Sequence, residues 1–393
     1  MYYRTTSNID TLPYYRLFFT VLCGYLSIGA TIQTIPLLHT EAAYTAHIVA
    51  IFITLSALGA AFSRPIAGYF ADRGYEKAVL LFGGILACLG GLGHYFNHTS
   101  YVFILARLCL GIGEGAIFTS AVTWLLTRTP SKHKGTIAGW LGLAMWGGLL
   151  IGPLLANYIL HITQQMQSIW LLITILPFVG ILLTASIQPS RHLSAAHTKL
   201  ALLPQQARLP GFAFLLTSYG YGTINALLML YLQQTKSYLF ANALTLFASA
   251  FLLVRLLGQT WVSIYGGRRI LLICCLLESI GFLLISDHVH TTSILFGILL
   301  AGAGMGLLYP AFVTITTQRV PNHQHGAAIG LMTSFWDTGI LLAGPIGGAI
   351  ANYINYQYAF YLAGFCSVIA FFIILGPLAQ PTISNWSNAH DSH

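Results

Sequence analysis

The chain has 393 residues, of which 56% are hydrophobic and 7% are charged, and its mean hydropathy is +0.75. Soluble proteins carry about 25% charged residues, so this composition excludes a soluble domain and predicts an all-α integral membrane protein. The formal net charge of +8 could suggest nucleic-acid binding. The basic residues gather in alternate loops, however, which is the positive-inside pattern of membrane topology, so we expect no nucleic-acid partner.

Apolar runs predict twelve membrane-spanning helices in two groups of six, separated by a polar segment. Residues 1–188 and 208–380 would each form a six-helix bundle, joined by a cytoplasmic linker at 189–207 and followed by a polar tail at 381–393. Both chain termini would lie in the cytoplasm, because the basic loops mark that side. The predicted spans are 14–38, 45–71, 77–96, 100–126, 134–160, 166–188, 208–234, 239–264, 268–286, 291–317, 325–352 and 356–378.

The two halves of the chain repeat at a constant offset of 191 residues. Such parallel repeats imply two bundles in the same orientation, with a binding site between them near the bilayer midplane. With one more residue of offset, Gly152-Pro153 also matches Gly344-Pro345. The constant offset aligns Arg64 with Arg255, Gly111 with Gly302, Gly113 with Gly304 and Gly115 with Gly306.

The corner after the second predicted span is rich in charge. Asp72 could pair there with a guanidinium group or with a helix N-terminus in one conformation and lose that contact in another. We interpret the corner as a cytoplasmic gate, and a solvated charged loop is the alternative. The gate residues would be Arg64, Gly68, Asp72, Arg73, Lys77 and, through the repeat, Arg255.

This corner resembles the loop signature G-x-x-x-D-R-x-G-x-K/R of the major facilitator superfamily. Gly68, Asp72, Arg73 and Lys77 match the signature, whereas Tyr75 stands where its second glycine is expected. The second-half copy also departs from the signature, because Ser263 takes the place of the acid.

The fourth predicted span carries two opposite charges, Arg107 and Glu114. Their spacing places them on one helix face, roughly 10 Å apart along the axis. A charge at membrane depth costs about 3 kcal/mol and usually faces a partner or a water-filled cavity. We therefore expect Glu114 to carry the proton and Arg107 to modulate it or to bind a substrate anion. A helix held to its neighbours by buried charges is the alternative.

The same span resembles the superfamily pattern R-x-x-x-G-x-G-x-G, with glycines at positions 111, 113 and 115. The glutamate seven residues after the arginine resembles a pair found in organic-anion symporters, Spinster-like carriers and arabinose-efflux-like exporters. The fifth span contains Gly148, Gly152 and Pro153 in a pattern that resembles the antiporter motif G-x-x-x-G-P-x-x-G/A. A proline there lets a helix bend and pack closely against its neighbour, and we expect Gly344-Pro345 to do the same in span eleven.

The remaining candidates would line the substrate cavity. Asp337, near mid-depth in span eleven, could line that cavity, act as a second proton site or have a structural hydrogen-bonding role. A small amphipathic substrate would suit polar and aromatic walls. The cavity candidates are Tyr25, Gln33, Phe118, Trp140, Tyr219, Tyr221, Asn225, Tyr309 and Trp336.

The resemblance implies a monomeric, proton-coupled secondary transporter in the bacterial inner membrane, which moves a small organic molecule by alternating access. Export of a drug-like compound, metabolite or metallophore by proton antiport is the leading hypothesis, and import of a nutrient or small organic anion by proton symport is the alternative. A receptor with a transporter fold is a third. We expect no enzymatic activity, no metal site and no cofactor besides the coupling proton.

Overall fold

The computed structural model describes residues 12–35, 46–96, 100–188, 201–235, 242–287 and 290–379, and these residues form helices without a strand. The first half contains α1 (Leu12–Thr34), α3 (Ala46–Phe70), η2 (Ala71–Tyr75), α4 (Glu76–Tyr95), α5 (Ser100–Thr127), η3 (Ser131–His133), α6 (Lys134–Thr163) and α7 (Met166–Ala185). The second half contains α8 (Gln205–Gln234), α9 (Ala243–Leu257), α10 (Trp261–Tyr265), α11 (Gly267–Ile285), α12 (Thr291–Met305), α13 (Leu308–Thr317), η5 (Asn322–Gln324), α14 (His325–Tyr353) and α15 (Tyr356–Leu375).

Every predicted span contains helix, although two spans of the second half consist of two pieces each. By length and hydropathy, eight helical stretches of the described residues could cross a membrane, and one of them runs from α3 through η2 to α4. The eighth span breaks between α9 and α10 at Gly258, and the tenth breaks between α12 and α13 at Gly306. Glycine is a poor helix former, which favours a break at both places. The predicted linker at 189–207 and tail at 381–393 fall largely outside the described residues.

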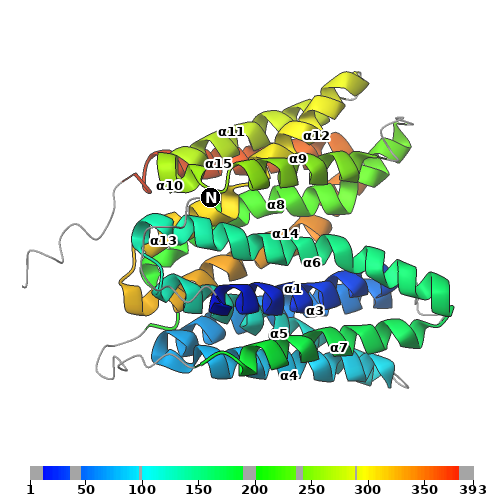
Figure 1. Ribbon diagram of the computed structural model, residues 1–393. Coiled ribbons are helices and arrows are strands. Elements are labelled where there is room, and N and C mark those ends of the chain that lie inside the picture. The colour runs from blue at the N-terminus through cyan, green and yellow to red at the C-terminus, as the bar shows by residue number, and fades with distance from the viewer. Residues whose placement is uncertain are drawn as a thin grey trace, which may run out of the picture.

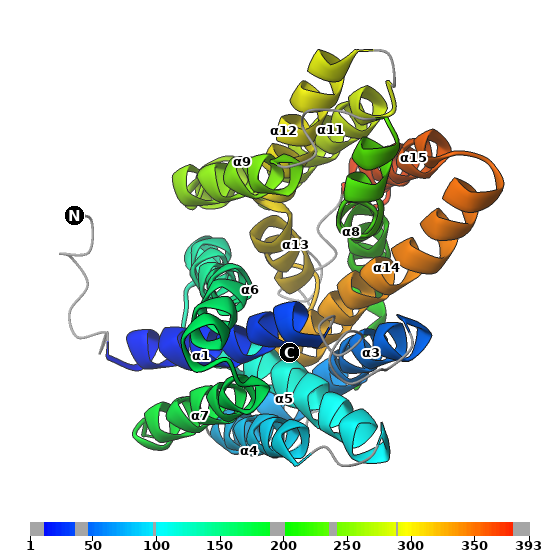
Figure 2. The same ribbon diagram turned by 90° about the vertical axis from the view of Figure 1, so that its right-hand side faces the viewer.

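The helices run side by side in two groups, which Figure 2 shows end-on. Within the first half, α5 packs against α3 and α4, and α1 packs against α6 and α7; within the second, α14 packs against α8, and α11 packs against α12 and α15. The groups meet where α14 contacts α3 and α5, and where α13 contacts α6. We call the end at which α7 ends and α8 begins the linker end; it lies to the left in Figure 1.

The repeat is visible in equivalent contacts at the linker end. Lys77 donates to the carbonyl oxygens of Ala185 and Ile187 at the end of α7, over 2.8 and 2.6 Å. Arg268, its match at the offset of 191, donates to the carbonyl oxygens of Ile374 and Leu375 at the end of α15. Both cations therefore satisfy free carbonyl groups at a helix C-terminus, where the helix dipole favours positive charge.

Glycines bring α5 into backbone contact with two neighbours. A Cβ atom on Gly111 would collide with the carbonyl group of Ser56 in α3, and one on Gly113 would collide with the carbonyl oxygen of Gly83 in α4. Small residues permit such close approach between membrane helices. The glycine spacing thus fixes α5, with Glu114 on it, between α3 and α4.

Candidate functional site

A guanidinium group between two carboxylates forms the centre of the candidate site. Arg64 of α3 donates from Nε to Asp337 Oδ2 over 2.6 Å and from Nη2 to Asp337 Oδ1 over 3.4 Å. The same Nη2 lies 3.5 Å from Glu114 Oε1 of α5. The three side chains are only 5, 12 and 13% exposed. Because Asp337 belongs to α14, this buried cluster ties the two halves together.

The α3–α14 contact beside this cluster depends on Pro65. Proline has no N–H, so the carbonyl group of Ala61, four residues earlier, receives no helical hydrogen bond from it. Ser334 of α14 donates to this oxygen over 2.6 Å. The hydroxyl lies one turn before Asp337, so the proline places a second bond between the halves next to the ion pair.

The structure shows the partners of two arginines that the sequence placed in the candidate site. Arg64 was expected in the cytoplasmic gate with Asp72, but it binds the two buried carboxylates instead. Arg107 was expected to modulate Glu114 or to bind a substrate anion. Its charge does reach Glu114, and its side chain also donates to Thr31 Oγ1 of α1 over 3.1 Å, while Arg64 lies 3.5 Å from the Glu114 carboxylate. The Arg64–Asp337 pair spans 273 positions, and no sequence pattern indicated it.

Arg255, the second-half match of Arg64, has a different environment. It is 1% exposed and donates to the carbonyl oxygens of Gly306, over 3.1 Å, and of Gly139 in α6, over 3.3 Å. Pro310, four residues after Gly306, leaves that carbonyl free, which explains why it accepts from a side chain. At the offset of 191, Met305 and Trp146 take the places of Glu114 and Asp337. This arginine therefore joins the halves through carbonyl groups that cannot be protonated near neutral pH.

Asp72 binds the start of α14 at the linker end. Its carboxylate accepts from the backbone N–H groups of Gly326 and Ala327 over 2.7 and 2.8 Å. The first N–H groups of a helix have no partner within the helix and carry partial positive charge, so an anion from the other half stabilises them. Gly68 makes the contact possible, because a Cβ atom there would collide with the Gly326 carbonyl group.

The other two residues of the predicted corner make different contacts. Arg73 lies over the Tyr69 ring, 4.4 Å from its centroid. Lys77 binds the end of α7, within the first half. Of the four residues that match the loop signature, Asp72 and Gly68 therefore form the contact between the halves.

Replacing Asp72 by alanine should open the linker end more often. Losing a cap of this kind costs about 2 kcal/mol, which corresponds to a roughly 30-fold larger open population. Thr314 is 7% exposed and lies against Gly135 of the other half, so a cysteine at position 314 should react with maleimide about 30-fold faster in the Asp72→Ala protein. Asp72→Asn, which keeps an acceptor oxygen, should have a smaller effect. Equal labelling in Asp72→Ala and Arg73→Gln proteins would contradict the assignment.

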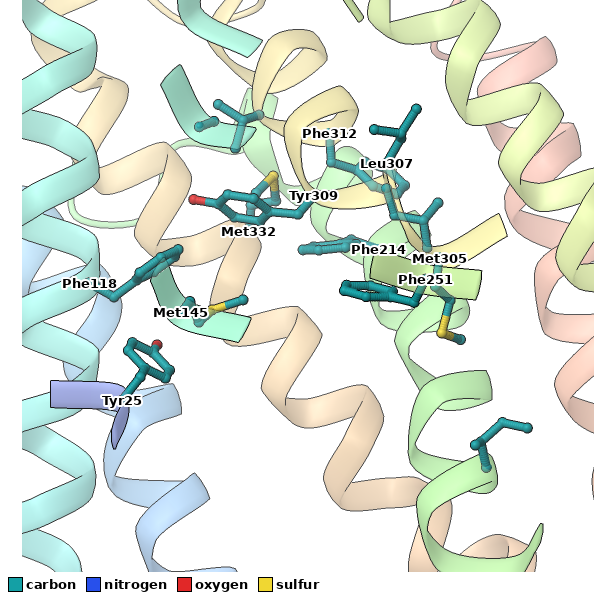
Figure 3. Packing of buried hydrophobic residues seen from close by; sticks show 14 of the residues in the cluster. Tyr25, Phe118, Met145, Phe214, Phe251, Met305, Leu307, Tyr309, Phe312 and Met332 are labelled. Atoms are coloured by element: carbon teal, nitrogen blue, oxygen red, sulfur yellow. The ribbon is translucent and has the colours of Figure 1, made fainter. Parts of the chain in front are cut away.

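Aromatic rings surround the charged cluster and continue across the interface. Phe118 lies between Tyr25 and Tyr309, with ring centroids 5.7 and 5.5 Å away (Figure 3). Arg64 lies over the same Phe118 ring at 5.6 Å. Trp146 of α6 contacts rings of the second half: Tyr221 at 5.2 Å, Phe251 at 4.7 Å and Trp336 at 6.4 Å.

The cavity candidates separate into two groups. Tyr25, Phe118, Tyr221, Tyr309 and Trp336 belong to this ring network. Asn225 is exposed one turn after Tyr221 and donates to the Tyr221 carbonyl group over 2.8 Å.

The other candidates lie elsewhere. Trp140 is 48% exposed and packs against Phe18 of α1, and Tyr219 is buried beside Gly347. The side chain of Gln33 lies outside the described residues. Sequence reasoning missed Trp146, Phe214 and Phe251; the only signal for Trp146 was its match to Asp337 in the repeat.

The two glycine–proline motifs differ in their packing. Cβ atoms on Gly148 and Gly152 would collide with Tyr25 and Leu26 of α1, so this motif brings α6 against α1 as expected. A Cβ atom on Gly344 would meet nothing within 4 Å, so Gly344 itself does not pack closely as expected; Gly347 of the same motif does, because a Cβ atom there would lie 3.0 Å from Leu227 of α8. Gly339, the match of Gly148 at the offset of 191, contacts α8 instead.

Comparison with known proteins identifies the family. The family model described as the Major Facilitator Superfamily matches residues 17–238 and 210–389. The chain is 29% identical over 339 residues to the uncharacterized MFS-type transporter YhhS of Escherichia coli strain K12, covering 84% of each chain. It is 25% identical over 373 residues to the uncharacterized MFS-type transporter STM4428 of Salmonella typhimurium strain LT2, covering 93% of this chain and 96% of the relative.

Solved structures share the fold. The human organic anion transporter MFSD10 superimposes with a TM-score of 0.78 at 13% identity, covering 94% of this chain and all (100%) of that one. The transporter FucP in its outward conformation gives a TM-score of 0.75 at 16% identity, with 94 and 99% coverage. These matches confirm the predicted all-α fold of twelve helices in two bundles and the assignment to a family of transporters, not enzymes. The chain belongs to the Major Facilitator Superfamily.

Proposed function

We propose that the protein is a proton-coupled secondary transporter, which exports a small organic molecule across the bacterial cytoplasmic membrane by proton antiport. The observation that carries the proposal is the buried Arg64, which is shared between a carboxylate of its own half, Glu114, and one of the other half, Asp337. Ionisable groups inside a membrane protein are costly to bury and usually belong to ion or substrate pathways.

The position of one proton within this cluster would control the link between the halves. With a proton on Glu114, Arg64 keeps its bidentate pair with Asp337, and α3 stays tied to α14. With a proton on Asp337, Arg64 keeps a charged partner in Glu114 of its own half, and the ion pair across the interface is lost. Proton transfer between the two carboxyl groups would thereby be coupled to movement of the halves.

The contacts between the halves support an outward-facing state. At the linker end, Asp72 binds the start of α14, and Thr136 Oγ1 of α6 lies 2.8 Å from Ser263 Oγ of α10. Ser263 matches Asp72 at the offset of 191, so both copies of the corner contact the opposite half. If the linker end is cytoplasmic, as the basic residues predict, these bonds close the cytoplasmic side.

Export is supported by the motif in α6. Gly148 and Gly152 hold this helix against α1, and their spacing before Pro153 resembles the antiporter pattern. Import by symport is the second candidate, since the structural neighbours include proteins described as a fucose:proton symporter and a proton:xylose symporter. That alternative relied on Arg107 as an anion contact, and Arg107 is 4% exposed in this conformation.

Untargeted metabolite profiling of cells and medium would test the direction. It should compare cells that express the wild type, Glu114→Gln or no transporter. A compound enriched in the medium only with the wild type is expected and would name the substrate class. A compound enriched inside the cells would overturn the export proposal and favour symport.

Glu114→Gln should abolish uphill transport of that compound and leave exchange intact. The amide cannot release or accept the coupling proton, whereas exchange needs only the movement of the loaded carrier. Proteoliposomes with and without a pH gradient would separate the two activities. Glu278→Gln is the matched control, because Glu278 is buried and accepts from Ser367 over 3.0 Å within the second half. An unchanged pH-driven uphill rate in Glu114→Gln would exclude Glu114 as the proton carrier.

A further inference from the structure

Two residues at equivalent positions of the repeat meet at the linker end. Lys134 begins α6 and His325 begins α14, and they are 191 positions apart, which is the repeat offset. Lys134 Nζ lies 3.1 Å from His325 Nδ1 and 3.3 Å from Asn322 Oδ1. The two residues are 5 and 1% exposed. The starts of the two equivalent helices are therefore joined by a buried cation–imidazole contact.

The hydrogen bonds define the protonation state of the histidine. A lysine ammonium group can only donate, so His325 Nδ1 must accept, and the single ring proton lies on Nε2. His325 Nε2 lies 3.0 Å from the carbonyl oxygen of Thr317, which can only accept, so it receives this proton. Both ring nitrogens are thus engaged only while the imidazole is neutral. A second ring proton would point at the ammonium group, 3.1 Å away, in a buried place.

Within the part of the chain that the structure describes, no carboxylate contacts Lys134 or His325. Lys134 and His323 are the basic groups that act electrostatically on His325. The carboxylate of Asp72 is bound to the N–H groups of Gly326 and Ala327. The residues of α13 and α5 that face this end, Thr317 and Thr123, do not ionise. The ionisable residues at the same ends of neighbouring elements include Glu76 at the start of α4, Arg128 after α5, Lys132 and His133 of η3, Arg208 of α8 and Arg319 after α13.

We propose that Lys134 and His325 form a proton-sensitive seal, which opens the linker end when the pH on that side falls. The closed seal excludes a proton from His325, whereas an open linker end exposes the imidazole to water and allows it to bind one. The open state therefore binds more protons, and acid favours it. An unperturbed histidine titrates near pH 6.5, so the ratio of closed to open molecules should fall by up to about tenfold for each pH unit below that value.

Distance measurements between spin labels would test the seal in the full-length protein in nanodiscs. Labels at Lys132→Cys and Gln206→Cys, two exposed positions on opposite halves, should report the linker end once the six native cysteines have been replaced. We expect the wild type to shift from short to long distances between pH 7.5 and pH 5.5. His325→Asn, whose oxygen can accept from Lys134 but does not titrate, should lose this shift.

Matched variants make the result specific. His323→Asn should keep the wild-type shift, and Lys134→Gln should reduce it, because a neutral amide does not repel a protonated imidazole. When Asp337→Asn or Asp72→Asn is added to both proteins, the wild type should still show a pH-dependent shift that His325→Asn lacks. This separates the seal from the central carboxylates and from Asp72, whose pKa burial raises to about 8. If His325→Asn does not fold, as judged by gel filtration, Lys134→Gln replaces it as the test variant. Two results would overturn the proposal. One is a distance between the labels that does not change with pH in the wild type, and the other is a pH-dependent shift in the test variant as large as that of the wild type.

Discussion

Replacing Arg64 by glutamine is expected to abolish transport and to destabilise the protein by about 3–5 kcal/mol, because Asp337 and Glu114 would lose their shared counter-ion in a buried place. The expected readouts are a lower melting temperature by intrinsic tryptophan fluorescence and the loss of metabolite flux. Much of this destabilisation reflects the carboxylates that are left behind, not the net strength of the ion pair.

A second substitution tests that explanation. Asp337→Asn, added to Arg64→Gln, removes one of the two carboxylates that have lost their counter-ion. The double variant should therefore recover a large part of the lost stability without recovering uphill transport. Arg269→Gln is the control, since Arg269 is an exposed basic residue at the linker end. A stable and active Arg64→Gln protein would contradict the central role of the cluster.

Replacing Gly68 by alanine should strongly disfavour the closed linker end. The new Cβ atom would meet backbone atoms of Gly326 and Ala327, and these cannot turn away as a side chain can. Overpacking of this kind costs about 1–3 kcal/mol, so transport should fall about tenfold or more. The cysteine at Thr314, buried against α6 in the closed state, should become reactive toward maleimide.

Gly348→Ala provides the matched control for that substitution. Gly348 also lies within a helix, but a Cβ atom there would meet nothing within 4 Å. Transport and labelling should therefore stay at wild-type levels. Equal losses in both alanine variants would show that the effect at Gly68 comes from the helix itself and not from the approach of α14.

Several features of this protein follow from local properties of its sequence. Long apolar runs predicted the helices, since a segment in the bilayer must satisfy its own backbone hydrogen bonds. The repeat at 191 residues implied two bundles in the same orientation, and in the structure Lys77 and Arg268 each bind the end of a corresponding helix. The contact of Asp72 with a helix N-terminus was also foreseeable, because a carboxylate is a favourable partner for unpaired N–H groups.

The tertiary structure alone decided which charged groups meet. Arg64 and Arg255 look alike in the repeat, yet one binds two carboxylates and the other binds carbonyl groups, one of which Pro310 leaves free. The choice depends on the relative height and rotation of helices that are far apart in the chain, and a periodic pattern contains no information on either. For the same reason, the sequence did not indicate that Arg107 would contact Thr31 or that Trp140 would pack against Phe18. Helix identity is a property of each segment, whereas the pairing of charges is a property of the packed assembly.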